Sequence, residues 1–345
     1  MESVPRISVI VPCYNVERWL MRCLDSLFAA LPESAEAIAV DDASSDATLA
    51  ILRRRAKDEP RLKVIAAAHG GVSAARNRAL DVARGATVFF VDPDDAVEPD
   101  FFSAMEAELE RTQADGCICA YCDIDDETGT RTDVGLNGRY RYESNRAIVG
   151  DFLPRFFGYS FADVRAWYGG RPLFEGRREM GSACRMAFRR ALIEAGRIRF
   201  DEAVVLGEDA LFISEYLLSA SSFACIDRPL YRVTGRPSGA MRTITKDGLR
   251  FCRNKLAMLR KREALDRKSG GRLTPLYAAS CVLSLLEILA WTLRGRLPRG
   301  EGLRILREYL SAGPVRPALR GFPLSVRRPL VALAVLFLRA FGVIG

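Results

Sequence analysis

The chain has little histidine and no regular cysteine framework. His69 is its one histidine in 345 residues, which leaves no room for a multi-histidine metal centre, and Gly70 and Gly71 beside it do not suggest a catalytic triad. Nine cysteines, an odd number without framework spacing, favour a reducing compartment over a disulfide scaffold. Three of them, Cys117, Cys119 and Cys122, lie in an apolar run that is typical of a buried strand, and we prefer this interpretation to a zinc site.

Several other signals are also missing. No basic segment followed by an apolar core opens the sequence, which disfavours secretion. The first apolar run is followed by VPCYN and not by G-x-G-x-x-G, which disfavours hydride transfer with a dinucleotide. The glycine-rich phosphate loop expected of a sugar-nucleotide pyrophosphorylase is absent there too, and no internal repeat is visible.

Charge is distributed unevenly along the chain. The net charge is +8, but residues 240–345 hold 21 Lys and Arg against 6 Asp and Glu, whereas residues 1–239 hold 30 against 37. A basic tail suits nucleic acid, anionic lipid or a polyanionic substrate. Its arginines are interleaved with long aliphatic runs and not with exposed aromatics, which argues against nucleic acid.

Residues 7–122 alternate between short apolar runs and helical patterns. The apolar runs are ISVIV, AIAV, LKVIAA, TVFFV and CICAY, and helices are expected from Glu17, Asp46, Ser73 and Asp100. This alternation predicts an α/β fold with a mostly parallel central sheet. Further along, a helix is expected over 182–195 and another through Leu218, and Tyr231 and Arg232 are expected in a loop with Arg236 and Ser238.

Two apolar runs near the C-terminus are borderline for a membrane span, which needs about 20 apolar residues. For residues 276–293, which contain one charge, we favour a buried helix. For residues 329–345, which follow Arg327 and Arg328, an interfacial helix on an anionic membrane is at least as good an interpretation as burial.

The run TVFFVDPDDAV, Thr87–Val97, is the most informative segment. An apolar strand is followed at once by Asp92, Asp94 and Asp95, and carboxylates this close repel one another unless a cation or water screens them. Hard divalent cations prefer such oxygen ligands, so the run predicts a metal and phosphate site. Polar residues also follow ISVIV and AIAV, and three such clusters at one sheet edge indicate a ligand site.

Over roughly residues 5–240 the sequence resembles the family 2 glycosyltransferases, whose fold is the GT-A nucleotide-diphospho-sugar transferase sandwich. The resemblance rests on the order and spacing of ISVIVPCYN, AVDDASSD, GGVSAARNRAL, FFVDPDDAVEPDF, RFDEAVVLGEDALF and PLYR. It implies a glycosyltransferase domain over 1–240, with a nucleotide-binding half at 1–122 and an acceptor or catalytic half at 123–240. Residues 241–345 are then a helical, basic C-terminal extension.

The resemblance also implies roles for individual residues. Pro12, Tyr14, Asn15 and Asp42 line the nucleotide pocket with Asp41 beside them, although capping of the helix near Ser44 explains Asp41 alone equally well. Arg76 and Asn77, on the helix that follows Gly70 and Gly71, support either the nucleotide or the aspartate turn, and a purely structural helix start is the alternative. Asp92 and Asp94 match the D-x-D element, extended by Asp95, that holds Mn²⁺ or Mg²⁺ on the donor diphosphate. Which of the three touches the metal, and which positions ribose or sugar, stays open.

Asp209, beside Glu208 at a helix start, matches the family's general base. The implied activity is an inverting, metal-dependent transfer of a sugar from a nucleotide sugar, best a UDP sugar, to a glycan or lipid-linked acceptor in surface polysaccharide biosynthesis. The expected location is the cytoplasm, peripheral on the inner face of the cell membrane. The alternative is a catalytically silent sugar-nucleotide-binding or membrane-scaffold protein of the same fold.

Overall fold

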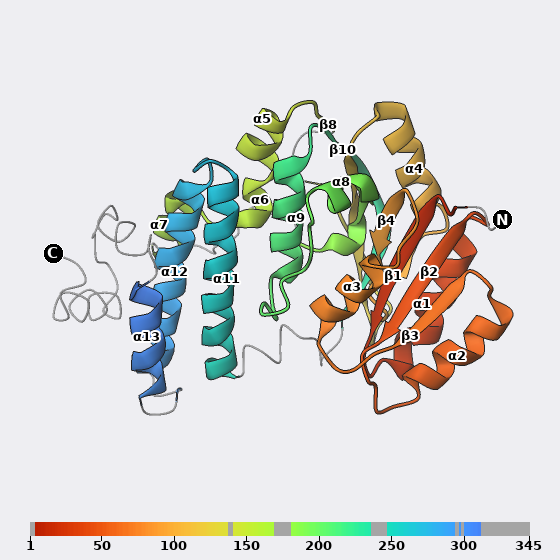
Figure 1. Cartoon of the computed structure of the whole chain (residues 1–345), viewed down its shortest axis with the longest axis horizontal. Helices are drawn as coiled ribbons and strands as arrows, with labels where there is room; N and C mark the ends of the chain where they lie inside the picture. Colours follow the sequence, from red (N-terminus) through yellow and green to blue (C-terminus); the bar gives the residue numbers. More distant parts are fainter. Residues whose placement is uncertain are drawn as a thin grey trace. The chain divides into compact units, whose positions relative to one another are not determined.

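The computed structural model describes residues 4–136, 141–168, 181–235, 247–293, 297 and 300–311. The chain divides into two compact units (Figure 1). The first unit comprises residues 1–153 and 179–237, and the second comprises residues 154–178 and 238–345.

The first unit is built on one sheet of ten strands. Its strands are β1 Ile7–Cys13, β2 Ala35–Asp41, β3 Leu62–Ala66, β4 Thr87–Phe90, β5 Ala96–Val97, β6 Gly116–Asp125, β7 Arg131–Val134, β8 Arg141–Tyr142, β9 Met186–Arg189 and β10 Phe223–Gly235. The order is β3-β2-β1-β4-β9-β6-β10-β5, with β7 beside β6 and β8 beside β10. Along that path β9 and β5 run against the other six strands, so the mostly parallel central sheet expected from the sequence is confirmed.

Helices cover both faces of this sheet. They are α1 Glu17–Ala30, α2 Thr48–Asp58, α3 Val72–Leu80, α4 Phe101–Thr112, α5 Asn145–Ala147, the π-helix η1 Ile148–Phe152, the 3-10 turn η2 Ala183–Arg185, α8 Arg190–Ala195 and α9 Glu208–Ser219. The predicted apolar stripe of α1 is buried. In β4 the ring of Phe89 packs on Phe102 of α4 at 5.1 Å, whereas that of Phe90 packs on Phe212 of α9 at 5.6 Å. Successive side chains of a strand point to opposite faces, so β4 is apolar throughout because both faces are covered.

Two expectations about the later part of this unit are wrong. Residues 182–195 are not one helix, because Met186–Arg189 form β9, which pairs antiparallel with both β4 and β6. Tyr231 and Arg232 do not lie in a loop, since both belong to β10, where Tyr231 is fully buried and pairs with Tyr121 of β6 and Val97 of β5. Arg236, Ser238 and the run 329–345 lie outside the described residues.

The second unit is helical where the structure describes it. Its helices are α6 Pro154–Phe157, α7 Phe161–Tyr168, α11 Gly248–Lys268, α12 Thr274–Leu293 and α13 Glu301–Ser311. The apolar run 276–293 forms α12, and within the described ranges Thr274–Thr292 is the one segment long and apolar enough to cross a membrane. In this segment 61% of the apolar stretch is buried inside the protein. The hydroxyl of Tyr309 on α13 donates to the carbonyl of Cys281 on α12. The helical character expected of the C-terminal region is confirmed for these residues.

Candidate active site

The polar clusters that follow the first, second and fourth strands meet at one edge of the sheet. β1 lies between β2 and β4 and runs parallel to both, so the carboxyl ends of these strands are adjacent. Pro12 is paired with Val40 within the sheet, and Asp41 closes β2. Ligands of open α/β sheets bind where the strand order reverses, as it does at β1. The fold therefore brings the sequence-predicted residues of the three clusters to a recognised ligand-binding position.

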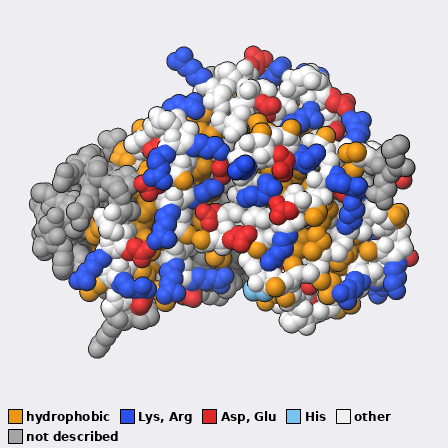
Figure 2. All heavy atoms as spheres, in the orientation of Figure 1, with side chains coloured by type: hydrophobic (Ala, Val, Ile, Leu, Met, Phe, Trp, Pro, Cys, Tyr) orange, Lys and Arg blue, Asp and Glu red, His pale blue; other side chains and the backbone are white. Residues whose placement is uncertain are grey.

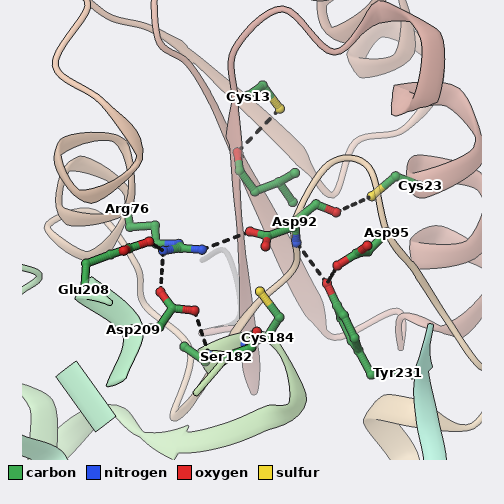
Figure 3. A network of polar contacts seen from close by, with 12 residues as sticks. Cys13, Cys23, Arg76, Asp92, Asp95, Ser182, Cys184, Glu208, Asp209 and Tyr231 are labelled. Atoms are coloured by element: carbon green, nitrogen blue, oxygen red, sulfur yellow. Dashed lines mark hydrogen bonds and ion pairs between the residues drawn. The ribbon is translucent and has the colours of Figure 1, made fainter. Parts of the chain in front are cut away.

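Arg76 of α3 is the centre of a buried ionic network (Figure 3). Its Nη2 lies 2.9 Å from Oδ1 of Asp92 after β4, and its Nη1 lies 2.6 Å from Oδ1 of Asp209 on α9. Oε1 of Glu208 is 3.4 Å from the same Nη1. The Arg76 side chain is only 2% exposed, and its guanidinium lies 5.0 Å from the ring centroid of Phe200. One guanidinium thus joins the predicted metal site to the predicted base.

Three carboxyl groups around one guanidinium leave the network rich in negative charge. Burial, reinforced by the charge of Asp209 and opposed by Arg76, raises the pKa of Glu208 to about 7. Burial likewise raises the pKa of Asp209, although the positive charge of Arg76 opposes it. The second oxygen of Asp209 accepts the backbone N–H of Ala183 at 2.9 Å. Charge of this sign in a desolvated site favours uptake of a proton or a cation.

The aspartate turn, residues 92–95, is held from two sides. Oδ2 of Asp95 accepts the hydroxyl of Tyr231 at 2.8 Å and its Oδ1 accepts the N–H of Thr234 at 2.8 Å. Arg22 of α1 donates to the carbonyl oxygen of Asp94 at 3.0 Å. Asp92 keeps 34% of its side chain exposed, whereas Asp94 and Asp95 are buried. Burial, together with the charges of Asp94 and Asp92, raises the pKa of Asp95.

Asp42 fixes the loop that precedes α3 through two hydrogen bonds. Its two carboxylate oxygens accept the backbone N–H groups of Gly70 at 2.8 Å and Gly71 at 2.7 Å. Gly71 has φ of 86°, a left-handed conformation that glycine adopts without strain. The buried carboxylate of Asp42 therefore shapes this loop by accepting its backbone N–H groups.

The chain carries an aromatic side chain, Tyr14, directly after β1 and a buried carboxylate, Asp41, at the end of β2. Tyr14 is 48% exposed, and its ring centroid lies 4.6 Å from that of His69. Asp41 accepts the N–H of Ser44 with Oδ2, as a cap would. Its Oδ1 is buried and has no hydrogen-bond partner among the described residues. This combination offers a flat surface and a buried acceptor.

The two predicted asparagines hold backbone segments together. Asn15 has φ of 50°, and its side-chain oxygen accepts the N–H of Ser45 at 2.8 Å. Asn77 donates to the carbonyl of Phe200 and accepts the N–H of the same residue, both at 2.9 Å. Asn77 therefore links α3 to the segment before α9, where it also donates to Oε1 of Glu202 at 3.1 Å.

Arg22 and Tyr231 make contacts with the aspartate turn that the sequence did not predict. Arg22 sits on the exposed rim of an ordinary amphipathic helix, where an arginine is commonplace, so no local signal distinguishes it. Tyr231 falls in the PLYR segment that the family resemblance includes, but its role depends on strand pairing that periodicity does not reveal.

Comparison with known proteins identifies the family. A family model described as glycosyl transferase family 2 matches residues 8–167, which include β1–β4, the aspartate turn and Arg76. The chain belongs to this family. Its glycosyltransferase relatives include the uncharacterised glycosyltransferase EpsJ of Bacillus subtilis, 30% identical over 235 residues, which are 68% of this chain and 62% of EpsJ.

Two further glycosyltransferase-type relatives extend the comparison. The putative glycosyltransferase EpsH of Bacillus subtilis is 28% identical over 290 residues, covering 82% of this chain and 78% of EpsH. The succinoglycan biosynthesis protein ExoO of Rhizobium meliloti is 31% identical over 226 residues, covering 65% of this chain and 58% of ExoO. The match thus spans about three fifths of EpsJ and of ExoO.

The glycosyltransferase fold is matched by solved structures as well. TarS 1–349 of S. aureus, crystallised with UDP-GlcNAc, superposes with a TM-score of 0.61 at 21% identity and covers 92% of this chain and 82% of its own. The complex of the same TarS fragment with UDP gives the same TM-score over 98% of this chain. The GT-A-like α/β architecture expected from the sequence is therefore confirmed.

Proposed function

We propose that this chain is a metal-dependent, inverting glycosyltransferase that moves a sugar from a UDP sugar to a glycan or lipid-linked acceptor in surface polysaccharide biosynthesis. One observation carries the proposal: Arg76 joins Asp92, at the end of β4, to Asp209, 117 positions later on α9. The carboxylate proposed to bind the donor, Asp92, and the proposed base, Asp209, thus contact the same guanidinium group. The names of ExoO and of TarS bound to UDP-GlcNAc support the acceptor class and the donor base.

We assign the nucleoside of the donor to the sheet edge after β1 and β2. The half-exposed ring of Tyr14, backed by His69, offers a face on which a base stacks. The buried Oδ1 of Asp41 is an acceptor with no partner among the described residues, and a base N–H would satisfy it. Pro12 and Asn15 shape the same edge, and Asp42 keeps the 70–71 loop in place by accepting its N–H groups.

Asp92 and Asp94 are the residues that would hold a divalent cation, and oxygens of the donor phosphates would supply further ligands, as is common for Mg²⁺ and Mn²⁺. Among the described residues no three His, Cys, Asp or Glu side chains form a metal cage by themselves. Both oxygens of Asp95 accept hydrogen bonds from β10, so we assign Asp95 to the support of the turn and the ion to Asp92 and Asp94. When bound, the ion would neutralise charge that develops on the departing nucleoside diphosphate.

Asp209 is the group we propose to take the proton of the acceptor hydroxyl. Arg76 and the N–H of Ala183 bind its two oxygens and so favour its charged form, the form a base needs. Burial acts in the opposite direction and raises the pKa of Asp209, which makes the carboxylate more basic. A single base opposite the leaving group would give inversion at the anomeric carbon.

The first test is thermal stabilisation by nucleoside diphosphates and their sugars, with MnCl₂ and with chelator. A ligand that binds the folded state raises the melting temperature, and we expect the largest rise with a uridine nucleotide plus manganese. A rise with a different base would replace the donor assignment, and no rise with any nucleotide would contradict the donor pocket.

The base is tested with Asp209→Asn, and Glu215→Gln on the same helix is the control. We expect Asp209→Asn to slow sugar transfer by about 10² to 10⁴ while it leaves nucleotide stabilisation intact, because general base catalysis typically contributes that much. Transfer at the wild-type rate would refute the assignment. Nucleotide binding without transfer in the wild type, across the acceptors tried, would favour a catalytically silent sugar-nucleotide-binding protein.

We also propose that the second unit faces an anionic membrane surface at the cytoplasmic side, where a lipid-linked acceptor would be presented. The support is the exposed basic row on α11, formed by Arg250, Arg253, Arg260, Arg267 and Lys268. Figure 2 shows Lys and Arg side chains along this helix. Basic helical surfaces of this kind are attracted to anionic lipid.

A further inference from the structure

Tyr231 reaches the aspartate turn with its hydroxyl group. The residue is fully buried in β10, and its ring centroid lies 6.0 Å from that of Phe101. Its hydroxyl oxygen accepts the backbone N–H of Asp92 at 3.1 Å and donates its proton to Oδ2 of Asp95 at 2.8 Å (Figure 3). One hydroxyl therefore binds the first and the last residue of the turn.

Asp95 is tied to the same strand through its other oxygen. Its Oδ1 accepts the N–H of Thr234, three residues after Tyr231 in β10. Within the turn the N–H of Asp95 also donates to the carbonyl of Asp92 at 3.0 Å. Both carboxylate oxygens of Asp95 are therefore occupied inside the protein, which separates Asp95 from the more exposed Asp92.

We propose that Tyr231, Asp95 and Thr234 form a clamp that positions Asp92 and Asp94 for the donor. In this clamp Asp95 is a structural acceptor and Tyr231 is a positioning residue, and neither touches the ion or the nucleotide. The inference rests on the proposed function and deepens it, since it divides the three aspartates of the turn into two ligands and one anchor.

The physical reason is electrostatic. Three carboxylates within four residues repel one another, so the turn does not hold its shape without internal bonds. A buried hydroxyl can accept and donate at once, which a phenylalanine ring of nearly the same shape cannot do. Replacement of Tyr231 by Phe would leave the Asp92 N–H and one Asp95 oxygen without this partner, at little change in packing.

Tyr216 of α9 provides a matched control. It is fully buried as well, and its hydroxyl accepts the N–H of Arg189 at 2.8 Å and donates to the carbonyl of Asp115. Tyr216→Phe therefore removes an equivalent buried hydroxyl that accepts one N–H and donates to one oxygen, but away from the turn.

The test measures amide hydrogen exchange in the full chain for the wild type, Tyr231→Phe and Tyr216→Phe. We expect the amides of Asp92 and Asp95 to exchange about tenfold or more faster in Tyr231→Phe and at the wild-type rate in Tyr216→Phe. Equal protection of these amides in all three proteins would overturn the clamp. Should Tyr231→Phe fail to fold, the wild type decides: the amide of Asp92, which donates to the Tyr231 hydroxyl, should be protected, and exchange at the rate of an unstructured peptide would overturn the clamp.

A second readout is the affinity for UDP, measured by calorimetry with MnCl₂ and with EDTA. We expect Tyr231→Phe to weaken manganese-dependent binding about tenfold and to leave binding in EDTA unchanged. Equal weakening in both conditions would mean that Tyr231 supports the nucleotide pocket generally, against the clamp. If the wild type does not bind UDP with manganese, the proposed function fails, and the exchange measurement alone decides whether the clamp exists.

Discussion

Arg76 is a buried cation with three carboxylate partners. Its guanidinium is buried, lies against the ring of Phe200 and binds Asp92, Glu208 and Asp209. A buried charge is tolerated only when its partners compensate the loss of water, and here each partner depends on the same cation. Loss of Arg76 is therefore expected to lower the stability of the fold and to disturb the proposed base, Asp209, at the same time.

Replacement of Arg76 by methionine is expected to cost about 3 to 5 kcal/mol of unfolding free energy, because it leaves buried carboxylates without their counter-charge. Arg199→Ala is the control, since Arg199 pairs with Asp81 at 3.0 Å on the surface and should cost less than about 1 kcal/mol. Urea unfolding at neutral pH measures both. Similar small losses would mean that the buried network is easily repacked.

Glu208 predicts a pH dependence of stability. Burial raises its pKa from 4.5 to about 7, so between these pH values the folded chain binds a proton that the unfolded chain has lost. This contribution to stability is complete below about pH 4.5 and disappears as pH rises through 7. From pH 5 to 8 the wild type should lose about 2 kcal/mol more than Glu208→Gln.

Chemical unfolding of both proteins at several pH values checks this difference. The burial-raised pKa values of Asp209 and Asp95 act with the same sign, so Glu208→Gln should retain part of the slope. Parallel curves for the two proteins would show that Glu208 is not the proton-binding group.

Sequence patterns predict which residues belong to this site, but they do not predict which of these residues contact one another. Asp92, Asp94 and Asp95 stand out because carboxylates directly follow an apolar strand. The bond from Arg76 to Asp209 joins positions 133 apart, and no local periodicity carries that information. The roles proposed for the three aspartates depend on Tyr231, whose hydroxyl contacts follow from strand pairing.

At the scale of elements, β9 shows where pattern reasoning fails. Residues 182–195 contain enough apolar and arginine residues to read as one helix, yet four of them, Met186–Arg189, bridge β4 and β6. The strand is short and buried, and a run of that length has no decisive period. Longer elements such as α1, β1 and α9 were predictable because their apolar pattern extends over more residues.

The junction between Gly85 and β1 yields a prediction at this scale. A Cβ at Gly85 would lie 2.3 Å from the backbone nitrogen of Ser8, a position that the strand cannot easily vacate. We expect Gly85→Ala to lose about 1 to 3 kcal/mol by overpacking. In Gly150→Ala the added methyl meets no atom within 4 Å, so its urea midpoint should stay near that of the wild type. Equal midpoints for both variants would show that β1 can shift.

At the scale of the whole molecule, the two parts of the chain differ in charge. We expect the full-length protein to sediment with vesicles that contain phosphatidylglycerol and not with neutral vesicles. Replacement of Arg250, Arg253 and Arg260 by Gln should weaken this binding about 100-fold, since each basic group near an anionic surface contributes about 1 kcal/mol. Equal loss in a control with Arg53, Arg54 and Lys57 of α2 replaced by Gln would contradict a role for α11.

The placement of the thiols has a practical consequence. All nine cysteines are buried and free, spread from β1 to α12. A maleimide should therefore leave the folded protein unlabelled, so that one cysteine introduced on the surface would accept a fluorophore or spin label without removal of any natural thiol. Further labels that are added slowly, detected by mass spectrometry, would then report the buried thiols that become accessible when the surrounding structure opens transiently.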